Sequence, residues 1–147
     1  MYLFTDSTNN TAAEIWIFDL INLEFKRIED ESYLVKEHSA NVKNEYIYIF
    51  GGYTIECKET DQLKKFNVQT KKLENVETTG LKPHWRRCHG SEIIKNDLYI
   101  FAGVYRNIIS DGGDFGNENP LNDLFKINLD TLEWTKIDTS GDIPEPR

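Results

Sequence analysis

The chain has 147 residues, with 39% hydrophobic and 29% charged side chains, a balance typical of one soluble globular domain. Its formal net charge is −8, which argues against a nucleic-acid partner because phosphate backbones are bound by basic surfaces. The two cysteines, Cys57 and Cys88, are too far apart in the sequence for a disulfide framework or a paired zinc motif. These features predict a protein of a reducing compartment, which we expect to be the cytoplasm.

The amino-terminal sequence shows no targeting pattern. No charged segment precedes an apolar run, and the first apolar run ends by Thr5. We therefore expect neither a signal peptide nor a membrane span in this sequence.

Short apolar stretches separated by turn residues follow one another along the chain and predict β-strands. The first group is expected at residues 2–4, 14–20 and 25–28. A second group follows at 38–42, 46–50, 63–68 and 73–76, and a third at 88–94, 98–101, 124–129 and 134–137. Asparagine, aspartate and threonine lie between the strands, where they supply hydrogen bonds to turns. The sequence thus predicts an all-β fold of antiparallel meanders.

Two landmarks repeat along the sequence. Residues 48–52 read YIFGG and return 51 residues later as YIFAG at 99–103, and a degenerate copy stands at 2–6. Residues 63–68 match residues 15–20, 48 positions earlier, and residues 124–129, 61 positions later. A repeat of about 50 residues is typical of the blades of a β-propeller.

The strands differ in how apolar they are. Residues 46–50 and 98–101 are almost continuously apolar, which favours strands that are covered on both faces. Residues 133–137 alternate and carry charge, which favours an outer edge strand. Gly51, Gly52 and Gly103 follow the apolar strands, where a residue without Cβ permits a sharp turn or a close backbone approach.

These residues resemble the repeats of the kelch family. Phe50-Gly51-Gly52 matches the family's apolar strand with its glycine pair, and Trp134 matches the tryptophan of the outermost strand. Gly80, Pro83, Arg86 and His89 match the family's inter-repeat motif, which begins again at Gly141, Pro144 and Arg147. The resemblance implies an incomplete propeller of about three blades, expected at residues 1–31 in part, 32–82 and 83–139, with 140–147 leading to a next blade.

The expected number of blades is too small for a closed ring. Propellers close with roughly four to eight blades, and 147 residues cannot supply them at about 50 residues each. We therefore expect the remaining blades to come from a longer chain or from self-association.

We find no sequence pattern for metal binding or catalysis. No tyrosine precedes a histidine, as in the copper oxidases that resemble this family, and the Glu-x-x-x-Asp-x-x-x-His pattern of its iron-dependent members is absent. His38 and His89 occupy equivalent repeat positions, which favours a hydrogen bond between blades over a metal site. The sequence predicts no enzyme and no cofactor.

Two long connections carry the candidate partner-binding residues, which are Trp85, Arg86, Arg87, Tyr105 and Arg106. Tryptophan and arginine are common at the energetic centres of interfaces. Arg86 also matches Arg147 in the repeat, so a structural role for it stays open. We expect residues 104–120 to form a long solvated loop, and Cys88 to be buried and inert although two arginines precede it.

The predicted function is protein–protein interaction, as a kelch-repeat adaptor or scaffold. In a meander, the connections after the second and the fourth strands lie on one face, and here they are the long ones. The resemblance implies a protein partner bound on that face. The alternative is part of an enzymatic or metal-binding propeller whose active residues lie in other blades.

Overall fold

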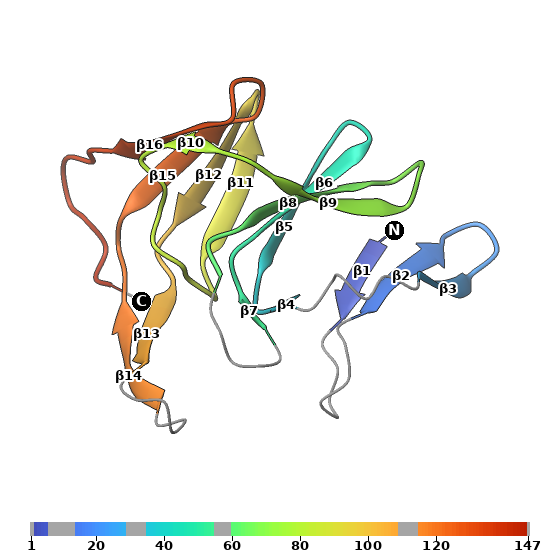
Figure 1. Ribbon diagram of the computed structural model, residues 1–147, viewed down its shortest axis with the longest axis horizontal. Coiled ribbons are helices and arrows are strands. Elements are labelled where there is room, and N and C mark those ends of the chain that lie inside the picture. The colour runs from blue at the N-terminus through green and yellow to red at the C-terminus, as the bar shows by residue number, and fades with distance from the viewer. Residues whose placement is uncertain (1, 6–13, 29–34, 55–59, 109–114, 147) are drawn as a thin grey trace.

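The computed structural model describes residues 2–5, 14–28, 35–54, 60–108 and 115–146. In this part of the chain the regular structure consists of β-strands, and three main sheets, each built on an antiparallel meander, follow one another in chain order (Figure 1). The described residues include no helix with the length and hydropathy needed to cross a membrane.

The first sheet has three strands in the order β1-β2-β3. They are β1 (Tyr2–Thr5), β2 (Glu14–Asp19) and β3 (Glu24–Ile28). The second sheet is a four-stranded meander of β5 (Ser39–Lys43), β6 (Tyr46–Phe50), β8 (Leu63–Asn67) and β9 (Lys72–Val76). A short antiparallel pair, β4 (Val35–Lys36) with β7 (Tyr53–Thr54), accompanies it.

The third sheet has five strands in the order β10-β16-β15-β12-β11. Its meander consists of β11 (Gly90–Ile94), β12 (Asp97–Phe101), β15 (Leu124–Asn128) and β16 (Glu133–Ile137). The short strand β10 (Thr79–Gly80) comes from the connection before this sheet and pairs with β16 in parallel. A separate hairpin consists of β13 (Val104–Ile108) and β14 (Phe115–Pro120).

The eleven predicted strands are confirmed, with ends that differ by no more than two residues from the observed ones. The prediction of a loop at residues 104–120 is wrong, because β13 and β14 pair there as an antiparallel hairpin. The short strands β4, β7 and β10 were also not predicted. Each is only two residues long, so no alternating pattern can develop in its sequence.

The outer turns of the three sheets are built alike. The side chains of Asp19, Asn67 and Asn128 each accept hydrogen bonds from the backbone amides two and three residues later, at 2.8–3.1 Å. Each turn then ends on a residue in the left-handed region, at Leu23, Lys71 and Leu132 with φ of 57°, 61° and 59°. The repeated sequence landmark therefore specifies a repeated turn.

The hydrophobic core lies between neighbouring sheets, as expected for stacked propeller blades. Between the second and third sheets, Phe50 contacts Trp134 with 5.1 Å between ring centroids, and both side chains are almost fully buried. Between the first and second sheets, Ile15 packs with Ile49 and Phe66. The face-to-face packing of sheets explains why residues 46–50 are apolar at successive positions: Ile47 and Ile49 face the first sheet, whereas Tyr48 and Phe50 face the third.

Candidate partner-binding surface

The two long connections that carry the predicted site residues lie side by side. The amide of Arg87 donates to the carbonyl of Val104 at 3.0 Å, and the amide of Val104 donates back to Arg87 at 3.0 Å. This bridge joins the connection before β11 to the start of the β13–β14 hairpin. The prediction that both connections lie on the same side is confirmed.

Arg86 is buried within this junction, with no exposed surface. Its guanidinium forms two parallel hydrogen bonds with the Asp123 carboxylate, at 2.6 and 3.1 Å. It also donates to the carbonyls of Ala102 at 3.0 Å and His84 at 3.1 Å. Arg86 is thus part of the scaffold and contributes nothing to the exposed surface, in agreement with the structural role suggested by its repeat position.

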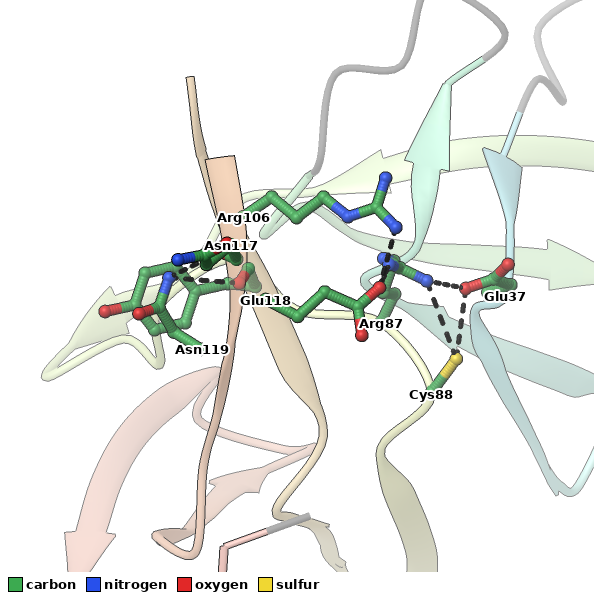
Figure 2. A network of polar contacts seen from close by, with 8 residues as sticks. Glu37, Arg87, Cys88, Arg106, Asn117, Glu118 and Asn119 are labelled. Atoms are coloured by element: carbon green, nitrogen blue, oxygen red, sulfur yellow. Dashed lines mark hydrogen bonds and ion pairs between the residues drawn. The ribbon is translucent and has the colours of Figure 1, made fainter. Parts of the chain in front are cut away.

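Arg87 lies between two carboxylates from distant parts of the chain (Figure 2). It forms ion pairs with Glu37, which precedes β5, and with Glu118 of β14 at 2.5 Å. The ring of Tyr53 lies 5.6 Å from its guanidinium carbon. Burial alone would lower the pKa of Arg87, but its bonds to both carboxylates outweigh burial and raise the pKa. Arg87 therefore ties the hairpin to the second sheet.

Arg106 completes this ion network from the opposite strand of the hairpin. It pairs with Glu118 in the β13–β14 register and donates to the same carboxylate at 2.7 Å. The hydrogen bonds from Arg106 and Arg87 lower the pKa of Glu118. Two arginines thus face two glutamates, and the network of Glu37, Arg87, Arg106 and Glu118 carries no net charge.

Cys88 borders this ion network. The prediction that Cys88 is buried is wrong: the residue is exposed, and its thiol donates to Glu37 at 3.0 Å. Partial desolvation and the Glu37 carboxylate raise the thiol pKa to about 11, against the opposing effect of Arg87. At neutral pH the thiol is therefore protonated and a weak nucleophile.

Three aromatic side chains contact one another in tilted orientations across the two connections, and we call them the aromatic cluster: His84, Trp85 and Tyr105. The His84 ring lies 4.2 Å from the Trp85 ring and 4.3 Å from the Tyr105 ring, measured between centroids. Trp85 keeps 40% of its surface exposed. Trp85 and Tyr105 were predicted, whereas His84 was not, because only the folded chain brings it against Tyr105.

His89 lies away from this surface and joins the second and third sheets. Its Nε2 forms a hydrogen bond of 2.7 Å with the hydroxyl of Ser39 on β5, which confirms the predicted hydrogen bond between blades. Burial, followed by the charges of Arg86 and His38, lowers the pKa of His89 to about 4. His89 is accordingly neutral at physiological pH.

Within the described residues, no three acidic, histidine or cysteine side chains gather closely enough to hold a metal ion. The exposed part of this surface therefore consists of the aromatic cluster, next to an ion network whose charges are compensated within the chain.

Comparison with known proteins gives a consistent picture. The model of the KLHDC2/KLHL20/DRC7 Kelch-repeats domain matches residues 1–147. The chain is 32% identical over 108 residues to human Kelch domain-containing protein 10, covering 68% of this chain and 21% of that protein. It is 30% identical over 101 residues to Tip elongation aberrant protein 1 of Schizosaccharomyces pombe, covering 69% of this chain and 8% of that protein.

A plant relative shows the same relationship of lengths. Acyl-CoA-binding domain-containing protein 4 of Arabidopsis thaliana is 30% identical over 110 residues, which cover 75% of this chain and 15% of that protein. The chain thus spans about a fifth or less of the length of these curated relatives.

Proposed function

Since the chain belongs to the kelch-repeat family, we propose that it is a protein–protein interaction module that acts as an adaptor or scaffold. Kelch repeats commonly mediate protein binding. In this proposal the chain is a non-catalytic component of the cytoplasm, and its partner contacts the aromatic cluster and the β13–β14 hairpin.

The exposed aromatic cluster supports this proposal best. Trp85 and Tyr105 are residue types that often dominate the binding energy of interfaces. Contact with the His84 ring holds both rings in place before a partner arrives, which reduces the entropy lost on binding. The scaffold beneath is fixed by buried Arg86.

The electrostatics of the site indicate what the partner offers. Arg87 and Arg106 are paired with Glu37 and Glu118, so their charges are already compensated within the chain. We propose that the partner inserts an uncharged apolar or aromatic segment against the cluster. Binding of this kind depends weakly on ionic strength, because Coulombic attraction contributes little.

A capture experiment tests the proposal. The chain is tagged, used to capture partners from cells, and compared with Trp85→Ala and with Val42→Ala, which alters a residue of 68% exposure on β5. We expect Trp85→Ala to lose a specific partner and Val42→Ala to keep it, with unchanged melting temperatures for both. Retention of every partner by Trp85→Ala, or equal losses for the two variants, would contradict the proposed surface.

A further inference from the structure

The interface between the second and third sheets shows which residues of two neighbouring sheets bury one another in this fold. The second sheet contributes Tyr48, Phe50, Leu63 and Val76, which are at most 9% exposed. The third sheet contributes the opposite side, which includes Ile127, Leu129 and Trp134 at 0%, 7% and 2% exposure. Leu132, from the turn before β16, packs against the same cluster.

The first sheet carries counterparts of the residues that the third sheet contributes to this interface. By the repeat offsets, Phe18, Leu20, Leu23 and Phe25 correspond to Ile127, Leu129, Leu132 and Trp134. Leu20, Leu23 and Phe25 are 66%, 70% and 60% exposed. Phe18 stacks on Phe25 with 4.5 Å between centroids. We call this side of the first sheet, with Leu20, Leu23 and Phe25 exposed on it, the first open face.

The third sheet carries counterparts of the other side. Tyr99, Phe101, Leu124 and Ile137 correspond to Tyr48, Phe50, Leu63 and Val76. The counterparts in the second sheet are buried, whereas these four are only half-buried. They form the second open face, which lies at the opposite end of the row of sheets from the first (Figure 1).

The segment after β16 repeats this contrast. Gly80 of β10 has φ of 81° and packs so tightly on β16 that a Cβ would overlap the carbonyl oxygen of Trp134. Its repeat counterpart Gly141 has nearly the same φ, 88°, but no atom lies within 4 Å of the corresponding position. Pro83 is fully buried, whereas its counterpart Pro144 is exposed. Gly141 thus has the left-handed conformation of Gly80, although no described strand pairs with its segment.

We propose that a second copy of this chain occupies both open faces. The first open face of each copy packs against the second open face of the other, as the third sheet packs against the second within one chain. Two such contacts close a ring of six sheets, which lies within the usual range of four to eight blades. A head-to-tail contact of this kind stops at two copies when the rotation closes.

The proposal also specifies a backbone contact. Within one chain, Thr79 and Gly80 pair in parallel with Glu133 and Trp134. The equivalent pairing joins Ser140 and Gly141 of one copy to Glu24 and Phe25 on β3 of the other. The close approach of that strand accounts for the conformation of Gly141, because only glycine leaves room for the facing carbonyl.

The mass of the 147-residue chain in solution is the first test, measured by light scattering across a concentration series. We expect a species of twice the 17.1 kDa chain mass. A monomer at all concentrations would overturn the proposal, and so would a mass that keeps growing with concentration, because an open filament does not close a ring.

Point variants then test the faces. Phe25→Asp and Ile137→Asp place a charge on the first and second open faces, and we expect both to shift the mass to 17.1 kDa. Leu81→Asp is the matched control, because Leu81 is 62% exposed and its repeat counterpart, Asp142, is already an aspartate. Dimers that survive both face variants, or that are lost equally with the control, would contradict the assignment.

Disulfide trapping tests the geometry independently of variant stability. Glu24→Cys with Ser140→Cys, in a chain with Cys57→Ser and Cys88→Ser, should give a reducible covalent dimer. Glu24→Cys with Thr79→Cys is the control and should stay monomeric on the gel, because Thr79 is already paired with Glu133 of its own chain. Absence of the first covalent dimer, or its formation in the control, would overturn the proposed register.

Discussion

The turn after β6 depends on the backbone conformation of a single residue. Gly52 has φ of 88°, and a Cβ there would overlap the carbonyl oxygen of Lys36. We predict that Gly52→Ala lowers the free energy of unfolding by about 1–3 kcal/mol, because the left-handed conformation and the clash both oppose a side chain. Gly90→Ala is the control: its Cβ would meet only the carbonyl of Phe101, at 3.8 Å. Equal shifts in urea midpoints would contradict this account.

The free energy of unfolding should depend on pH through the buried side chain of His89. Burial lowers its pKa from 6.5 to about 4, so the folded chain binds fewer protons than the unfolded chain between these values. The contribution of neutral His89 is fully present above pH 6.5 and is lost as the pH falls toward 4. The loss is on the order of 3 kcal/mol.

Urea unfolding at a series of pH values measures this effect. We expect the decline between pH 6.5 and 4.5 to flatten in His89→Gln, which cannot titrate but can still bond to Ser39. Glu118 does not account for this decline. Its pKa is lowered from 4.5, so its protonation reduces stability only at pH values below the range in which His89 acts. A wild-type decline that persists in His89→Gln would assign the pH dependence to other groups.

At the scale of the element, the β13–β14 hairpin depends on a single carboxylate that bonds two arginines (Figure 2). We predict that Glu118→Gln speeds amide hydrogen exchange in β13 by roughly tenfold, because the variant loses the charge-assisted part of its hydrogen bonds to both arginines. The melting temperature should stay nearly constant, since the hairpin adds little to the core. Glu74→Gln, which alters a surface pair with Lys65 at 3.5 Å, is the control. Faster exchange throughout the third sheet would contradict a local role.

The same elements show what could be predicted from the sequence. The long strands recur with their turns, so Tyr46–Phe50 was placed correctly by its apolar run alone. The hairpin has no such pattern, because β14 contains glycine, asparagine, glutamate and proline and is held by partners elsewhere. Glu37 lies 50 residues before Arg87, and Glu118 lies 31 after it, so the sequence could indicate an arginine at a junction but not its partners.

At the scale of the molecule, the sequence repeat indicates the environment of a residue better than the local apolar pattern does. Equivalent residues occupy equivalent environments wherever a neighbouring sheet is present, as the pairs Phe66 and Ile127 show at 0% exposure. Departures occur at the ends of the row, where Phe25 is exposed although its counterpart Trp134 is buried. Burial in this fold is therefore a property of neighbouring blades, which residue type alone does not determine.

The first and third sheets differ in how much apolar surface they bury, and this difference predicts the order in which the sheets open. The first sheet has three strands and leaves Leu20, Leu23 and Phe25 exposed, whereas the third has five strands and buries Ile127, Leu129 and Trp134. Because buried apolar surface is the main stabilising term, the first sheet should open at a lower free energy than the third. Native-state hydrogen exchange in increasing denaturant, on the dilute chain, should release the amides of β2 and β3 before those of β12 and β15. At higher concentration, protection of β3 should rise toward that of β12, because a second copy then covers the first open face. If all sheets exchange at one free energy at every concentration, the chain is a single cooperative unit and its two ends are not the weaker parts.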